Sequence, residues 1–222
     1  MTESTADPRT IADRAASRRR RKSRRARNAD TQADTRVDIL KSAARAFRKL
    51  GYHGATVEQI AAALHMKKGN LYYYFKNKEE ILFACHQYSL DRLTQLLEEI
   101  ERSDAPPDAK LRRLVSAFVH TILDELHGTA LFLDLEALTP QHLKAVIVRR
   151  DRFDRGVRKI LEEGVASGDF AAPGDNTVKL ITFAMMGAVN WIPRWFRPEG
   201  ASTSQEIADR FADFFVTGLR TR

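Results

Sequence analysis

The sequence predicts an all-α protein with an N-terminal three-helix helix-turn-helix domain and a C-terminal helical domain. Apolar residues recur at helical spacing along most of the chain, and caps, glycines and prolines interrupt them. No useful stretch alternates in the manner of a strand. Positive charge is concentrated at the front: residues 1–33 carry a net +6, residues 34–88 carry +4 and the remainder carries −2. This asymmetry favours a nucleic-acid-binding N-terminus joined to a second domain.

The length of 222 residues allows two domains and an additional arm. We predict a disordered basic arm at 1–33, a DNA-binding domain at 34–85 and a ligand-binding and dimerisation domain at 86–222. The arm lacks apolar periodicity, and eight of the ten positions from Arg18 to Arg27 are basic. Such an arm can follow DNA phosphates or enter a minor groove; the alternative is a solvated tail that only improves solubility.

The first helix of the DNA-binding domain is indicated by a stripe of apolar residues that Gly51 terminates. Thr56 then suits the N-cap of a second helix, since its hydroxyl accepts from a backbone N–H one turn ahead. His65 and Met66 form the turn. The first stripe consists of Val37, Ile39, Leu40, Ala43, Ala44, Phe47 and Leu50, and the second of Val57, Ile60, Ala61 and Leu64.

The third helix begins with Lys67, Lys68, Gly69 and Asn70, so its N-terminal N–H groups and cationic side chains would face phosphates and base edges. Leu71 and Phe75, four residues apart, would face the core. Three consecutive tyrosines at 72–74 cannot all be buried, although burial of any single one is the alternative interpretation. Glu58 would repel phosphate near this helix unless it accepts from a cytosine amine.

A fourth helix is predicted to start at Lys78, because Asn77 and Glu80 have nearly the spacing of a capping box. With this segment, residues 35–85 resemble the N-terminal domain of the TetR family of bacterial transcription regulators. The family pattern K-G-x-L-Y-x-Y-F stands at Lys68–Phe75, after a threonine cap and an alanine-rich helix. Asn70 occupies the first unspecified position of this pattern, where threonine is more usual in the family.

The resemblance implies phosphate contacts from Thr56, Tyr74 and Lys78, and approach to bases by Lys68, Asn70 and Tyr73, with Tyr72 between the two roles. The complete predicted DNA-binding set is Thr56, Lys67, Lys68, Asn70, Tyr72, Tyr73, Tyr74 and Lys78.

About six helices are predicted for the second domain. Thr139 and Pro140 would cap and begin one of them, and Thr203 with Glu206 forms a capping box for the last. Pro193 is expected to bend or end the helix before it. The predicted ranges are 78–104, 108–126, a short apolar piece at 131–138, 140–165, a helix capped by Asn176 that reaches Trp191, and 204–219.

The last two helices carry more aromatic surface than a thin domain can bury. Dimerisation through a four-helix bundle is therefore predicted, and burial inside a monomer is the alternative. Their apolar residues include Ile181, Phe183, Ala184, Ala188, Trp191, Ile207, Phe211, Phe214 and Phe215. A two-fold dimer would place its two copies of the third helix, the recognition helices, roughly 34 to 36 Å apart on a pseudo-palindromic site.

The segment 190–200 is similar to a W-x-R-P-x-G segment of a TetR subgroup that responds to coenzyme A thioesters of fatty acids or steroid fragments. A thioester site needs an apolar cavity and cations for phosphates. The alternatives are that the apolar residues are plain core and that the arginines pair with Asp151 and Asp154. The predicted ligand-binding set is Phe132, Arg149, Phe153, Phe183, Met186, Asn190, Trp191 and Arg194.

Enzymatic and metal functions find little support in the chain. His120, Asp124 and His127 share a helical face, and with His142 they raise a zinc alternative. No nucleophile elbow, glycine-rich phosphate loop or H-E-x-x-H is present. We therefore expect a protein that is not an enzyme and has no metal or cofactor.

The compartment is expected to be the cytoplasm, since no secretion signal or membrane span is evident and the single cysteine, Cys85, permits no internal disulfide. The leading functional hypothesis is a homodimeric repressor that binds double-stranded DNA and is released by a small apolar effector such as an acyl-CoA. The alternative is a non-specific architectural DNA-binding protein without an effector.

Overall fold

The computed structural model describes the backbone of residues 8–125, 134–171, 174 and 177–221, and side chains from residue 31 onward. The chain forms two compact units, one ending at Ile39 and one starting at Leu40. Helix α1 (Pro8–Gly54) supplies the first unit and continues into the second. Its start at Pro8 differs from the predicted disordered arm. A segment without apolar periodicity has no face that packs against a core, but it can still be helical. This segment is rich in alanine and arginine, and both residues favour helix.

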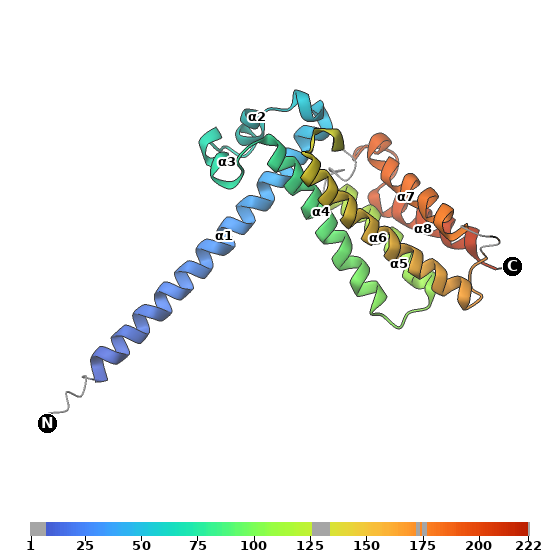
Figure 1. Cartoon of the computed structure of the whole chain (residues 1–222), viewed down its shortest axis with the longest axis horizontal. Helices are drawn as coiled ribbons and strands as arrows, with labels where there is room; N and C mark the ends of the chain where they lie inside the picture. The colour runs from blue at the N-terminus through green and yellow to red at the C-terminus, as the bar shows by residue number, and fades with distance from the viewer. Residues whose placement is uncertain (1–7, 126–133, 172–173, 175–176, 222) are drawn as a thin grey trace. The chain divides into compact units, whose positions relative to one another are not determined.

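The second unit begins with the DNA-binding domain (Figure 1). α1 kinks at Gly51, whose φ of 71° and ψ of 166° interrupt the helix where the sequence predicts its stop. Helices α2 (Val57–Ala62), α3 (Lys68–Tyr74) and α4 (Lys78–Glu101) follow. Their common core consists of Leu40, Ala43, Ala44, Phe47, Ile60, Ala61, Leu71, Phe75, Ile81 and Leu82, all buried.

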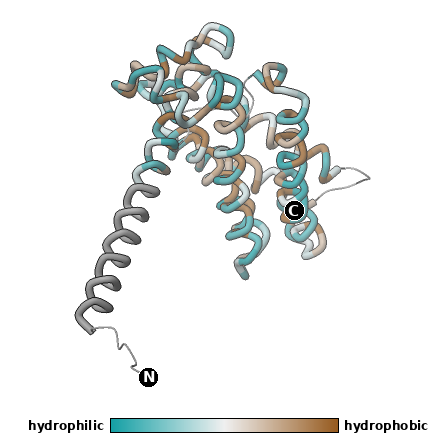
Figure 2. The backbone as a smooth tube through the Cα atoms, turned by 60° about the vertical axis from the view of Figure 1, so that its left-hand side comes forward, coloured by the Kyte–Doolittle hydropathy of each residue, from teal (hydrophilic) through white to brown (hydrophobic). Residues whose placement is uncertain are grey.

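The C-terminal domain is helical, as predicted. α4 is shared with it, α5 contacts α4, α6, α7 and α8, and α4 packs along α6. Figure 2 shows hydrophobic and hydrophilic stretches alternating along these helices, as expected when one face of each is buried. The further elements are α5 (Pro107–His120), a π-helical turn η1 (Thr121–Glu125), a 3₁₀ turn η2 (Leu135–Ala137), α6 (Pro140–Ala166), α7 (Thr177–Trp195) and α8 (Ser204–Leu219).

The predicted helix starts are confirmed at Asn77, Thr139 and Thr203, whose side chains accept from the backbone N–H three residues ahead. One helix end differs. α7 continues to Trp195 with Pro193 inside it, because a proline near the helix end removes only one ladder bond and Phe196 N still donates to Ile192 O at 2.9 Å. The predicted cap Asn176 and the segment 131–133 lie outside the described residues.

Within the described ranges no β-strand forms, and a single isolated bridge joins Phe170 to Arg220. The same part of the chain contains no helix that is both long and apolar enough to cross a membrane.

Candidate nucleic-acid interface and ligand cavity

The start of α2 is fixed by a complete capping box. Thr56 Oγ1 accepts from Gln59 N at 3.2 Å, and Gln59 Oε1 accepts from Thr56 N at 2.9 Å. The sequence predicts the Thr56 cap, and the reciprocal contribution of Gln59 was missed, although threonine followed three residues later by glutamine is its known signature. The exposed Thr56 hydroxyl keeps its own O–H for donation to an external acceptor.

The turn between α2 and α3 contains His65 with a φ of 54°. Met66 N donates to Ala61 O at 2.9 Å, which closes the end of α2 and reverses the chain. The predicted turn at His65 and Met66 is confirmed. It brings the start of α3 to the surface, where Lys67, Lys68, Gly69 and Asn70 are all exposed.

No side chain caps the start of α3. Leu71 and Phe75 are buried, as their spacing predicts. Tyr72 and Tyr73 are 44% and 71% exposed, so the interpretation of these two as core aromatics is wrong. Tyr74 is half-buried and packs edge-on against Tyr73 with ring centroids 5.3 Å apart. The outer side of α3 therefore presents Lys68, Asn70 and the rings of Tyr72 and Tyr73, and Lys67 is exposed directly before it.

Glu58 is paired with Lys68 at the start of α3, the recognition helix. Its Oε1 lies 2.5 Å from Lys68 Nζ, and the same ammonium lies 5.6 Å from the centroid of the Tyr72 ring. The hydrogen bond between them lowers the pKa of Glu58 and raises the pKa of Lys68. The carboxylate thus orients the lysine, a contact that the sequence analysis did not foresee for Glu58.

Lys78 has a structural role that the sequence analysis missed. Its Nζ donates to Tyr52 O at 2.7 Å and to Ala55 O at 2.9 Å, and it lies 4.3 Å from the centroid of the Tyr52 ring. Carbonyls that follow a helix stop at glycine lack helical partners, and lysine commonly satisfies them. Two of the three ammonium N–H groups are engaged within the domain.

Helices α4 and α6 are joined beside the DNA-binding domain. Glu79 Oε1 accepts from Thr139 N at 3.0 Å and lies 2.8 Å from His142 Nδ1. The His142 ring stacks on Phe83 with centroids 3.8 Å apart and planes at 4°. The start of α6 is therefore held against the first turns of α4, directly after the recognition helix.

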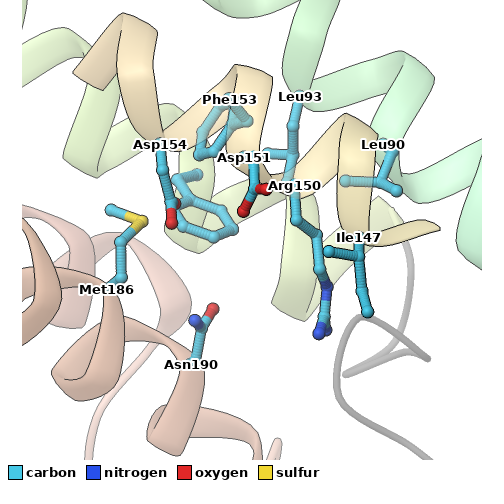
Figure 3. Close-up of a pocket in the computed structure, with 10 residues that line it drawn as sticks. Leu90, Leu93, Ile147, Arg150, Asp151, Phe153, Asp154, Met186 and Asn190 are labelled. Atoms are coloured by element: carbon cyan, nitrogen blue, oxygen red, sulfur yellow. The ribbon is translucent and has the colours of Figure 1, made fainter. Parts of the chain in front are cut away.

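A cavity of about 290 Å³ lies farther along these helices (Figure 3). Leu90 and Leu93 of α4, Phe118 of α5 and Met186 of α7 contribute apolar walls. α6 contributes most of the remaining lining: Ile147, Arg150, Asp151, Phe153 and Asp154. Asn190 of α7 completes it. The volume and the mixture of apolar walls with few polar groups are typical of a small-molecule site.

Burial affects three polar residues of the cavity lining. Burial lowers the pKa of the Arg150 guanidinium, which nevertheless stays cationic, and raises the pKa of the Asp154 carboxyl. Asn190 Oδ1 is shielded from solvent and has no hydrogen-bond partner in the described part of the chain. A buried amide oxygen without a partner is costly, so the cavity is suited to a ligand that supplies one.

Of the predicted ligand-binding residues, the structure brings Phe153, Met186 and Asn190 together around the cavity. Phe183, Trp191 and Arg194 are exposed on α7, where Arg194 lies over the Trp191 ring. Phe132 lies outside the described residues. The sequence missed Leu90, Leu93 and Phe118, since helical periodicity cannot tell cavity lining from core.

Arg149 does not reach the cavity lining. Its guanidinium bonds Gln87 and Asp91 of α4, and Arg152 bonds Glu98 at 3.2 Å. The predicted surface pairing thus forms, for Arg149 and Arg152, with the α4 carboxylates of Asp91 and Glu98.

The candidate metal residues are not gathered. His120 Nδ1 lies 2.8 Å from Asp124 Oδ2, and its Nε2 lies 3.1 Å from Gln205 Oε1. His142 is engaged with Glu79 instead, and His127 lies outside the described residues. Within the part of the chain that the structure describes, no three metal-ligating side chains lie together.

The capped α2, the tight turn and an exposed α3 bearing lysines and tyrosines define a helix-turn-helix DNA-binding protein, here joined to a helical domain with a ligand-sized cavity. The family model for bacterial regulatory proteins of the tetR family matches residues 39–85. The model for the tetracyclin repressor-like C-terminal domain matches residues 104–219. The chain belongs to the TetR family of bacterial transcription regulators.

Relatives of known character span nearly the same length. The HTH-type transcriptional repressor KstR2 of Mycobacterium tuberculosis is 28% identical over 188 residues, which cover 83% of this chain and 92% of the relative. The crystal structure of PfmR from Thermus thermophilus is 31% identical with a TM-score of 0.72, covering 82% of this chain and 99% of that one. AibR in complex with isovaleryl coenzyme A and operator DNA is 28% identical with a TM-score of 0.66, covering 79% and 95%.

Proposed function

We propose that the protein is a homodimeric repressor that binds a pseudo-palindromic operator and is released by a small apolar effector, for which an acyl-CoA thioester is the favoured class. It would act on DNA in the cytoplasm. The observation that carries this proposal is the cavity between α4, α5, α6 and α7, whose α4 wall is continuous with the DNA-binding domain. A purely architectural DNA-binding protein has no need of such a cavity.

On DNA, we assign phosphate contacts to Thr56, Tyr74 and Lys78, and base contacts to Lys68, Asn70 and Tyr73, with Lys67 and Tyr72 beside them. The exposure of α3 supports this assignment. Lys68 would leave Glu58 for a base edge or phosphate, and Lys78 would use its remaining N–H. Phosphate contacts set affinity, whereas base contacts set sequence preference.

The effector class is supported by two observations. The similar protein AibR binds isovaleryl coenzyme A, a thioester of a short branched acid. The cavity of about 290 Å³ lies at the lower end of the usual range for ligand sites, about 300–1,000 Å³, and therefore suits a compact acyl group. The coenzyme A portion would extend from the cavity mouth past Arg150, a cation suited to phosphate.

Dimerisation is supported by the outer surfaces of α7 and α8, where large apolar side chains remain exposed in the single chain. These are Leu180, Phe183, Trp191, Trp195 and Phe214. Several large exposed apolar side chains on two helices are typical of a subunit interface, and a two-fold axis beside them would give the four-helix bundle predicted from the sequence.

Release requires that the effector prefer a conformer in which the two recognition helices no longer match successive major grooves. A ligand that binds both conformers with equal affinity leaves their populations unchanged. Since α4 lines the cavity and also follows α3 after three residues, ligand contacts on α4 bear directly on the placement of α3.

The test is binding of the purified protein to its own upstream DNA and to scrambled DNA at physiological salt, followed by fluorescence anisotropy. Isovaleryl-CoA, hexanoyl-CoA and the matching free acids are added in turn. We expect selective binding that a thioester reverses. Equal affinity for scrambled DNA would contradict operator recognition and leave architectural binding as the function. Selective binding that no thioester or acid affects would contradict the effector class.

A further inference from the structure

The cavity contains one polar atom that the folded chain leaves unsatisfied. Asn190 lies on α7, and Figure 3 shows its amide directed into the space between α7 and α6, opposite Asp154 and Arg150. Its Oδ1 is shielded from solvent and has no hydrogen-bond partner in the described ranges. An apolar ligand would leave this atom buried and unpaired, whereas a ligand with a hydrogen-bond donor would pair it.

The groups facing Asn190 restrict what that ligand can carry. Arg150 offers only donors, and Asp151 and Asp154, on the same helix α6, offer acceptors when ionised. An ammonium group on the ligand only donates and so cannot accept from Arg150, and a ketone has no proton for the amide oxygen. A hydroxyl group donates to one partner and accepts from another, so it can pair with the amide oxygen and also accept from the guanidinium.

This argument does not depend on which way the amide is turned. Amide oxygen and nitrogen are assigned from the surrounding hydrogen bonds, and exchanging them would leave a donor rather than an acceptor unpaired. A hydroxyl group serves either arrangement.

Asp151, the other polar residue of the lining, is exposed to solvent, and the remaining lining residues are apolar. Leu90, Leu93, Phe118, Phe153 and Met186 are buried apolar side chains around the cavity. The group that fills the space beside the hydroxyl is therefore hydrocarbon, and the cavity volume keeps it compact.

We propose that the effector buries a compact hydrocarbon group bearing a hydroxyl, and that Asn190 is the residue that recognises this hydroxyl. The proposal rests on the proposed function for its effector role, and it narrows the class from acyl thioesters in general to hydroxyacyl thioesters. The recognition itself is a property of the cavity and can be measured without DNA or coenzyme A.

The test compares cyclohexanol with methylcyclohexane, probes of similar size that differ by a hydroxyl, in calorimetric titrations of the full-length protein. Asn190→Leu removes the amide at similar volume. We expect this variant to bind cyclohexanol roughly tenfold more weakly and methylcyclohexane no more weakly than the wild type. Met186→Leu, a change in the apolar wall, serves as the matched control and alters both affinities together.

Two results would overturn the proposal: no binding of cyclohexanol to the wild type, or an Asn190→Leu variant whose two affinities change by the same factor. Circular dichroism establishes whether Asn190→Leu is folded. If that variant does not fold, Asn190→Ala, which adds no bulk, is used in its place.

Operator release separates this proposal from the proposed function. Hexanoyl-CoA is compared with its 3-, 4- and 5-hydroxy derivatives on the DNA complex. If a hydroxyacyl thioester releases the DNA at a lower concentration than hexanoyl-CoA does, and Asn190→Leu removes this difference, the result supports both hydroxyl recognition and the proposed repressor function. Equal potency of all four would contradict hydroxyl recognition and retain the repressor. No release by any, with the cyclohexanol preference intact, would contradict the thioester class and retain the role of Asn190.

Discussion

The ammonium of Lys78 donates to two backbone carbonyls near the end of α1, Tyr52 O and Ala55 O. We predict that Lys78→Met lowers the free energy of unfolding by about 1–3 kcal/mol, since buried acceptors lose a charged donor. Urea denaturation without DNA measures this. Lys76→Met, two residues away and exposed, is the control and should stay within about 0.5 kcal/mol of wild type. An equally small effect at Lys78 would show that its carbonyl bonds are not formed in solution.

Cys85 illustrates burial of an ionisable group. Its Sγ lies 3.5 Å from Leu40 O, and burial raises the pKa of the thiol to about 12 from an ordinary value of 9.0. In the folded state the thiol stays protonated while the unfolded state ionises, so its stabilising contribution is complete below about pH 9 and is lost as the pH rises toward 12.

We therefore predict that the thiol does not react with a disulfide reagent at pH 8 until the protein is unfolded by urea. Above about pH 9, wild-type stability should fall more steeply than that of Cys85→Ala, because only the wild type has this thiol. Rapid labelling of the native protein, or parallel stability profiles of the two proteins, would contradict full burial.

At the scale of the helices, most starts were predictable because they depend on local chemistry. Thr139 with Pro140 and Thr203 with Glu206 are signals contained within four residues, and the structure confirms them. The contacts of Arg149 with α4 and of Lys78 with the end of α1 join residues far apart in sequence. Periodicity identifies which face of a helix is polar, but it does not identify the neighbour across that face.

In the candidate sites too, residues placed by local sequence patterns were predictable, and residues placed by packing between helices were only partly so. The exposed residues of α3 follow from a local pattern, and their exposure in the structure agrees with the roles proposed for them. In the cavity, Phe153, Met186 and Asn190 were predicted, while Phe183 and Trp191 of the same helix α7 face outward. The W-x-R-P-x-G resemblance locates the helix, and only the packing of α7 on α6 determines which of its side chains turn inward.

The packing at the end of α6 depends on Gly164. A Cβ atom there would lie 2.5 Å from Cε2 of Phe170 and closer still to Cδ2 of the same ring, which is itself buried. We predict that Gly164→Ala destabilises the fold by about 1–3 kcal/mol, because the ring has no free space to enter. Thermal or urea denaturation measures it. Gly69→Ala, where a Cβ meets nothing within 4 Å, should be neutral or slightly stabilising, and similar losses at both positions would contradict this account.

For the whole molecule, the outer surfaces of α7 and α8 set the assembly. Phe214 is 74% exposed in the single chain, and in the proposed bundle a carboxylate at this position would be buried without a partner. We predict that Phe214→Glu shifts the molar mass in light scattering toward the monomer value of 25.2 kDa and weakens operator binding.

Val148→Glu places the same charge on an exposed apolar site of α6, outside the proposed interface, and should leave the dimer intact. A Phe214→Glu protein that remains dimeric at micromolar concentration would exclude an interface centred on that residue.

The bonds from Glu79 to Thr139 and His142 fix one end of the α4 and α6 pair, while the cavity lies between the same helices near Leu90 and Leu93. Eleven to fourteen residues of helix correspond to a lever arm of about 16–21 Å. In the proposed mechanism, a bound effector that spreads the helices by about 1 Å at the cavity would rotate α4 by only about 3° around Glu79. Because this pivot lies next to α3, the proposed rotation would act at the helix assigned to DNA contact, and the strength of the Glu79 bonds would set how much of the rotation reaches α3.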